Sequence, residues 1–94
     1  MARRRYLVAY DIREPRRLRK VCKTMEEYGE RLQYSVFISD LSRSELIHMR
    51  AQVERHMDLS QDSVVIVDLG DVDTARFTFV GQRRELPEHG ATII

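Results

Sequence analysis

Residues 6–12 read Tyr-Leu-Val-Ala-Tyr-Asp-Ile, a run that is apolar except for one carboxylate. Apolar side chains occupy both alternating sets of positions between residues 5 and 12, which is typical of a strand with two covered faces. Asp11, near the C-terminal end of the run, interrupts one of these sets. The pattern predicts a central strand, or a strand whose second face is buried by a partner.

The residues that follow this strand predict an amphipathic helix over residues 15–28. Pro15 is tolerated in a first helical turn, Glu14 lies beside the positive end of the helix, and Gly29 is the expected stop. The positions i, i+3, i+4 and i+7 form a core-facing set: Leu18, Val21, Cys22 and Met25. The opposite face carries four basic residues, here called the basic stripe: Arg16, Arg19, Lys20 and Lys23.

Further strands and a second helix follow. Residues 31–39 alternate again and form either one bent strand or two short antiparallel strands. Ser42 and Glu45 match a capping box, and Leu41 and Leu46 are placed as a hydrophobic staple. The core-facing set of this second helix is Leu46, Met49, Val53 and Met57. Residues 64–69 and 77–80 predict two more strands, and the β-prone residues 92–94 are expected to pair with something.

Length and composition limit the architecture. A chain of 94 residues and 11.1 kDa corresponds to a single domain over residues 1–94, with one two-layer core of helices and strands. A hydrophobic content of 43% excludes disorder, and a single cysteine excludes an intramolecular disulfide. No apolar run approaches the roughly 20 residues of a membrane span or the core of a secretory signal. We therefore expect a cytoplasmic protein without a membrane association.

The net charge of +1 conceals an uneven distribution of charge. Residues 1–31 contain ten basic and five acidic side chains, whereas residues 32–94 contain six basic and ten acidic ones. Arginine predominates among the basic residues, and it suits bidentate contact with phosphate. The basic N-terminal third indicates a surface that faces a polyanion, and the alternative is a solvated helix face.

Asp11 is the candidate for metal-dependent chemistry. An acidic residue at the end of a strand, where a loop opens into a helix, suits Mg²⁺ in phosphoryl chemistry. One carboxylate holds a divalent ion poorly, and Glu14 is the only other acidic residue nearby. A two-fold dimer would supply a second Asp11. The alternative is an aspartate that only starts a loop or caps the helix.

Other polar and aromatic residues form weaker patterns. The three histidines, His48, His56 and His89, have neither zinc nor triad spacing and are interpreted as surface residues. The acidic residues near residue 70 are interpreted as a polar turn rather than a calcium loop. Five aromatic residues either stack bases on a sheet or belong to the core and an interface: Tyr10, Tyr34, Phe37, Phe77 and Phe79.

Three segments in order resemble one known family. They are residues 6–12, residues 16–23 running to Tyr28-Gly29, and residues 31–37, which read Arg-Leu-Gln-Tyr-Ser-Val-Phe. Together they are similar to the Cas2 family of CRISPR-associated proteins, over residues 5–69. The resemblance implies a ferredoxin-like βαββαβ fold of the α+β class, with an antiparallel sheet and an extra C-terminal strand. It also implies a homodimer in which the sheets face each other and the C-terminal strand joins the partner's sheet.

The resemblance further implies an endonuclease that depends on Mg²⁺ and cleaves single-stranded RNA or double-stranded DNA. Such a protein would take part in spacer acquisition in prokaryotic antiviral defence, together with a CRISPR integrase protein. By motif match, Asp11 would be the catalytic, metal-binding residue, surrounded by Tyr10, Ser35 and Phe37. The expected nucleic-acid contacts are Arg16, Arg17, Arg19, Lys20 and Arg31. Ile38 stands where many members have Glu, which removes a polar contact.

Two alternatives come from other functional classes. The first is a non-catalytic dimeric scaffold that positions duplex DNA for the integrase, in which the basic stripe carries the function. The second is a regulatory ferredoxin-like module that binds a small ligand, and the basic stripe argues against it.

Overall fold

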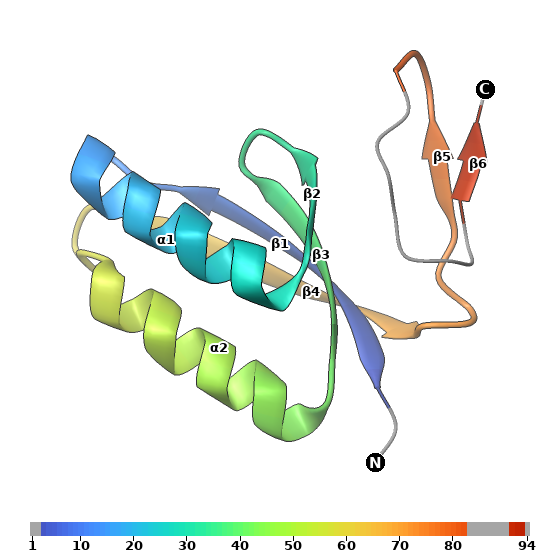
Figure 1. Cartoon of the computed structure of the whole chain (residues 1–94), viewed down its shortest axis with the longest axis horizontal. Coiled ribbons are helices and arrows are strands. Elements are labelled where there is room, and N and C mark those ends of the chain that lie inside the picture. The colour runs from blue at the N-terminus through green and yellow to red at the C-terminus, as the bar shows by residue number, and fades with distance from the viewer. Residues whose placement is uncertain (1–2, 83–90, 94) are drawn as a thin grey trace.

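The computed structural model describes residues 3–82 and 91–93, in which two helices cover one face of an antiparallel sheet (Figure 1). The elements in chain order are β1 (Arg4–Asp11), α1 (Pro15–Tyr28), β2 (Glu30–Gln33), β3 (Val36–Leu41), α2 (Arg43–His56), β4 (Ser63–Asp71), β5 (Phe77–Phe79) and β6 (Ala91–Ile93). None of the helices in the described residues has the length and apolar character that a membrane span requires.

The four-stranded sheet has the order β2-β3-β1-β4, and every neighbouring pair in it is antiparallel. This is the predicted ferredoxin-like βαββαβ arrangement, and β1 is central as expected. Residues 31–39 form two strands rather than one, because the chain turns at Tyr34 and Ser35. The extra C-terminal strand, β6, pairs in parallel with β5 in a separate two-stranded sheet, drawn in orange and red in Figure 1.

α1 begins and ends where the sequence predicts, and α2 begins at its predicted cap. α2 ends at His56, so Met57, predicted as a core-facing helix residue, is its C-cap. Glu14 caps α1 by accepting a hydrogen bond from the backbone N–H of Arg17 (2.8 Å), and Ser42 and Glu45 form the reciprocal capping box of α2. Gly29 ends α1 with an extended backbone, at φ −166°. A side chain at Gly29 would overlap the carbonyl oxygen of Ile38 and the hydroxyl of Ser39. Close approach to β3 is therefore the reason for a glycine at this position.

The core lies between the helices and the face of the sheet that they cover. Tyr6, Val8 and Tyr10 of β1 are buried there. They pack with Phe37 of β3 and with a group of helix residues: Val21, Met25, Met49 and Val53. Burial of these apolar side chains is the main favourable contribution to folding.

The second face of the sheet is apolar and partly uncovered. Leu7 and Ala9 of β1 are half-buried, and they lie opposite Val67 and Val65 of β4. The exposed fractions of Val65 and Val67 are 56% and 41%. These four residues, Leu7, Ala9, Val65 and Val67, are called the open face. The described residues of one chain thus cover the second face of β1 only in part.

One end of this second face is closed by an ion pair. Arg5 is fully buried and donates two hydrogen bonds to the carboxylate of Asp40, at 2.7 and 2.8 Å. The Arg5 guanidinium carbon lies 5.9 Å from the ring centroid of Phe77, close enough for a cation–π contact. The segment that leads into β5 is therefore held against the start of β1.

Asp62 joins the connection between α2 and β4 to the start of α1. Its carboxylate accepts hydrogen bonds from the backbone N–H groups of Arg13 (2.9 Å) and Asp58 (2.9 Å). The Arg17 guanidinium donates two more, from Nε at 2.8 Å and from Nη2 at 3.2 Å. The Asp62 side chain is fully buried, so these contacts hold the loop that follows Asp11.

The ion pair with Arg17 and the backbone donors hold the pKa of Asp62 well below its ordinary value. An aspartate in the unfolded chain titrates near about 3.9. Because the folded-state pKa is the lower of the two, the carboxylate stabilises the fold above about pH 4. This stabilisation is lost as the pH falls through the folded-state pKa.

Asp62→Asn is expected to lower the melting temperature by several degrees near neutral pH, because the charge of Arg17 loses its partner. Between about pH 5 and pH 3, the wild-type protein should lose more stability than this variant does. Thermal denaturation followed by circular dichroism at each pH measures both effects. Glu27→Gln is the control, since the Glu27 side chain is exposed and forms no hydrogen bond or ion pair in the described part of the chain. Equal losses in the two variants would contradict the role of Asp62.

Candidate nucleic-acid interface and metal ligand

Asp11 ends β1 with an exposed side chain, opposite Ser63 of β4. Because side chains alternate along a strand, Asp11 lies on the same side of the sheet as Leu7 and Ala9 of the open face. The backbone N–H of Tyr10 donates to the carbonyl oxygen of Ser35 at 3.0 Å, which ties the end of β1 to the β2–β3 turn. Asp11 thus has an accessible carboxylate, and pairing with β4 and the hydrogen bond from Tyr10 to Ser35 hold its backbone in place.

The described part of one chain offers little more than this carboxylate to a metal ion at this site. Within residues 3–82 and 91–93, no group of three or more His, Cys, Asp or Glu side chains is arranged to hold a metal. Mg²⁺ keeps several of its waters and is commonly bound through one or two carboxylates. The carboxylate of one chain could therefore provide one of two protein ligands for Mg²⁺. Asp11 of a second copy would provide the other.

Arg17 occupies a different position from the other predicted phosphate ligands. Its guanidinium is bound to Asp62, its side chain is 25% exposed, and the hydrogen bonds with Asp62 raise its pKa. These contacts fix the first turn of α1 relative to the end of β1. Arg17 therefore orients the loop behind Asp11, and a contact of Arg17 with nucleic acid stays a prediction.

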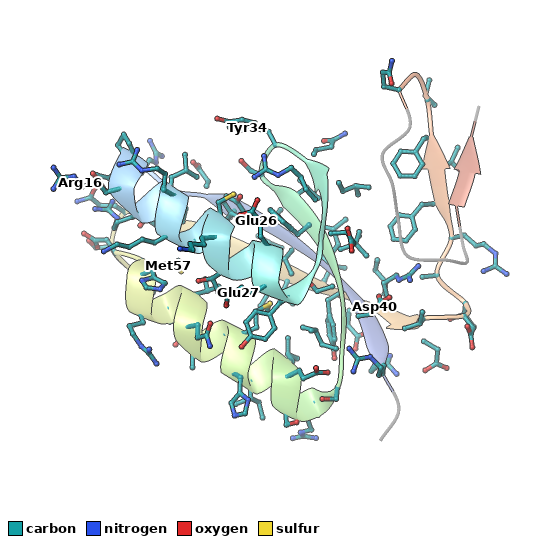
Figure 2. The ribbon with its side chains drawn as sticks, in the orientation of Figure 1. Arg16, Glu26, Glu27, Tyr34, Asp40 and Met57 are labelled. Atoms are coloured by element: carbon teal, nitrogen blue, oxygen red, sulfur yellow. The ribbon has the colours of Figure 1, made fainter. Side chains whose placement is uncertain are left out.

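The basic stripe is an exposed surface, as the helical spacing predicts. The side chains of Arg16, Arg19, Lys20 and Lys23 are all exposed on α1. No carboxylate of the described residues lies within ion-pair distance of them. Arg16 lies at the N-terminal end of α1, the end that follows Asp11 in the chain (Figure 2). This run of unpaired positive charge is suited to a phosphate backbone.

Arg31 is bound to sulfur and aromatic rings. Its Nη2 lies 2.6 Å from the sulfur of Cys22. Its guanidinium carbon lies 5.4 Å from the ring centroid of Phe37 and 6.0 Å from that of Tyr34. No described carboxylate forms an ion pair with Arg31, so its charge is available to a ligand.

Tyr10 and Phe37 belong to the core. Their rings are stacked, with centroids 6.1 Å apart and an interplanar angle of 26°. Burial raises the pKa of the Tyr10 hydroxyl, which is therefore neutral over the physiological range. Because both rings lie on the helix-covered face, they are across the sheet from the Asp11 carboxylate of the same chain. Ser35 lies in the β2–β3 turn, and Ile38, on β3, is fully buried.

Asp62 is a structurally important residue that the sequence alone does not single out. Its ion pair with Arg17 spans 45 positions, and no local pattern around Asp62 indicates such a partner. The sequence pattern also does not distinguish Tyr34 from the other four aromatic residues, whereas in the structure its side chain is 79% exposed. The Gly, Asn or Asp that often marks a turn is absent from the β2–β3 turn, so nothing in the pattern placed Tyr34 at its tip.

Comparisons with known proteins agree with this fold. The family described as CRISPR associated protein Cas2 matches residues 4–76. The CRISPR-associated endoribonuclease Cas2 1 of Rhodospirillum rubrum is 42% identical over 92 residues, which cover 95% of this chain and 89% of that protein. The CRISPR-associated endoribonuclease Cas2 of Geobacter sulfurreducens is 41% identical over 71 residues, which cover 76% of this chain and 75% of that protein.

A solved structure supports the same assignment. The crystal structure of Streptococcus pyogenes Cas2 superposes with a TM-score of 0.66 at 31% identity, and the match covers 70% of this chain and 86% of that one. The family match, the identities and the shared fold lead to one conclusion: the chain belongs to the Cas2 family of CRISPR-associated proteins.

Proposed function

We propose that this protein is a cytoplasmic, Mg²⁺-dependent endonuclease that acts as a homodimer on RNA or duplex DNA during spacer acquisition. The observation that carries the proposal is the exposed Asp11 carboxylate at the edge of an uncovered apolar face. Relatives at 41–42% identity bear the name endoribonuclease, which supports a nuclease role. A CRISPR integrase protein is the expected partner.

The open face supports a dimer. Val65 and Val67 expose a large part of their apolar surface next to Leu7 and Ala9, and such patches favour burial against a partner. Packing two open faces around a two-fold axis would cover this surface on both chains. The same packing would bring the two Asp11 carboxylates toward each other, since Asp11 follows Ala9 on this side of β1.

In this dimer, Asp11, the basic stripe and the Asp62–Arg17 ion pair would have different roles in phosphodiester hydrolysis. The two Asp11 carboxylates would hold the ion, and bound Mg²⁺ supplies polarisation of the phosphate and a lowered pKa for an attacking water. The basic stripe would hold the phosphate backbone on either side of the reacting bond. Asp62 and Arg17 would maintain the position of the loop between these two parts.

The second candidate function is a non-catalytic scaffold that positions duplex DNA for the integrase. It is favoured by the donor set, since the described part of one chain contributes one carboxylate to this site. It is also favoured by Ile38, a buried apolar side chain at the position where the family resemblance implies Glu. The basic stripe serves both functions, because each needs a surface for phosphate. Only the first function requires Asp11.

Asp11→Asn is expected to reduce Mg²⁺-dependent cleavage of RNA or duplex DNA by at least about 100-fold, since it removes the charge that recruits the ion. Binding of nucleic acid and the melting temperature should persist. Gel assays with and without EDTA measure the cleavage, with Asp73→Asn as the matched control. Equal cleavage by wild type and Asp11→Asn would exclude Asp11 as the metal ligand. No cleavage by any of the proteins would favour the scaffold.

Replacing Arg16, Arg19 and Lys20 together by Ala is expected to weaken binding of duplex DNA. The slope of log Kd against log salt should fall by roughly 0.9 for each lost phosphate contact. Fluorescence anisotropy at several salt concentrations measures the slope. The matched control replaces three exposed arginines of α2, Arg43, Arg50 and Arg55, and so removes the same charge elsewhere. Equal changes of slope in the two triple variants would show that only net charge matters.

Val65→Lys is expected to convert the protein from dimer to monomer, because it places a charge in the open face. Ile47→Lys, on α2, is the matched control, since both residues are 56% exposed. Sedimentation velocity at micromolar concentration distinguishes the two states. Deleting residues 91–94 removes β6, which pairs with β5 in the single chain. In a dimer whose C-terminal strand joins the partner's sheet, as the family resemblance implies, this deletion should also weaken the dimer. A well-folded wild-type monomer would refute the dimer.

A further inference from the structure

A groove lies between α1 and the β2–β3 hairpin, on the helix-covered side of the sheet. Its cavity volume is about 430 Å³. This is within the range of roughly 300–1,000 Å³ that is typical of small-molecule sites. Tyr10 and Cys22 line it together with Arg19, Lys23, Arg31 and Tyr34. Glu26 is the one acidic residue of this lining. The groove thus combines aromatic, basic and acceptor groups within one small volume.

The Tyr10 hydroxyl is a buried polar group at this groove whose hydrogen-bonding capacity is not used. Tyr10 is 6% exposed, and its hydroxyl has no hydrogen-bond partner among the described residues. The Cys22 thiol and the Arg31 guanidinium, which both line the groove, interact with this hydroxyl electrostatically. Neither of them completes a hydrogen bond of normal geometry with it. A buried donor without a partner is unfavourable, so a ligand with an acceptor atom would gain by reaching it.

Tyr34 provides a flat surface at the entrance of the groove. Its side chain is 79% exposed, and it extends from the tip of the hairpin (Figure 2). The Arg31 guanidinium lies 6.0 Å from its ring centroid and supports the ring from the protein side. The rings of Tyr10 and Phe37 stack on each other in the core and present no free face. Tyr34 is therefore the ring of this groove that a planar ligand can stack on.

Two basic side chains complete the entrance. Arg19 and Lys23 are exposed on α1, and no described carboxylate lies within ion-pair distance of either. They extend the basic stripe to the edge of the groove. An aromatic surface beside a positively charged track is the arrangement that binds single-stranded nucleic acid.

We propose that this groove binds one unpaired base of a single-stranded nucleic acid. The base stacks on Tyr34, its edge accepts a hydrogen bond from the Tyr10 hydroxyl, and its flanking phosphates contact Arg19 and Lys23. This inference rests on the proposed nuclease function and specifies how a single strand is held. Duplex DNA cannot use the groove in this way, because its bases are paired and stacked.

The test compares binding of two fluorescein-labelled oligoribonucleotides of equal length in EDTA, which prevents cleavage. One is an unstructured single strand, and the other carries abasic sites along its central part. Tyr34→Ala should weaken binding of the intact strand by roughly 5- to 100-fold and leave binding of the abasic strand and of duplex DNA unchanged. Tyr34→Phe keeps the ring and should bind as the wild type does.

Two further variants make the test specific. Tyr10→Phe removes only the hydroxyl and should weaken binding of the intact strand without lowering the melting temperature. Leu59→Ala, at a residue that is 72% exposed and outside the groove lining, should change neither. An intact strand that carries 2-aminopurine should show a fluorescence change on binding to the wild type, and this change should disappear with Tyr34→Ala.

The outcomes separate this inference from the proposed function. Equal affinity of the wild type for intact and abasic strands would overturn the base-binding groove and leave a backbone-binding nuclease in place. If Tyr34→Ala weakened binding of the intact and the abasic strand equally, the base-binding groove would also be overturned. A backbone contact or a folding defect would then explain the effect. Failure of the wild type to bind any of the three nucleic acids would overturn both proposals.

Discussion

β1 lies between β3 and β4, and the alternation of its side chains decides what each side of the sheet can do. Tyr6, Val8 and Tyr10 point to the helices and form the core, so Leu7, Ala9 and Asp11 must point to the other side. A shift of one residue in register would exchange the two sets and destroy the core. The position of the candidate carboxylate is therefore coupled to the stability of the whole fold.

The two candidate surfaces depend on this strand in different ways. The open face and Asp11 lie on the uncovered side of β1, which is suited to contact with a second copy of the chain. The groove at Tyr34 and the basic stripe lie on the helix-covered side, where the Asp62–Arg17 ion pair holds α1 and Ser35 holds the end of β1. In a two-fold dimer, both sides would then serve one nucleic acid, with cleavage at the axis and strand binding at the periphery.

The sequence was sufficient for the start of both helices, for the end of α1 and for the two apolar faces of β1, because caps, stops and periodicity are local signals. The sequence did not decide whether residues 31–39 form one strand or two, since the alternation continues through the turn at Tyr34 and Ser35. It did not indicate Asp62, because hydrogen bonds between residues 45 positions apart leave no local trace. The alternation also could not tell which face of β1 the helices cover, so the separation of Tyr10 from Asp11 became clear only in the fold. The dimer and the metal stay predictions.

We expect one chain to supply half of a metal site. Titration of the protein with Mn²⁺, followed by electron paramagnetic resonance as a stand-in for Mg²⁺, measures the stoichiometry of that site directly. We expect one tightly bound ion for every two chains in the wild type, and loss of this ion in Asp11→Asn. One ion per chain, or a stoichiometry that Asp11→Asn leaves unchanged, would contradict this expectation.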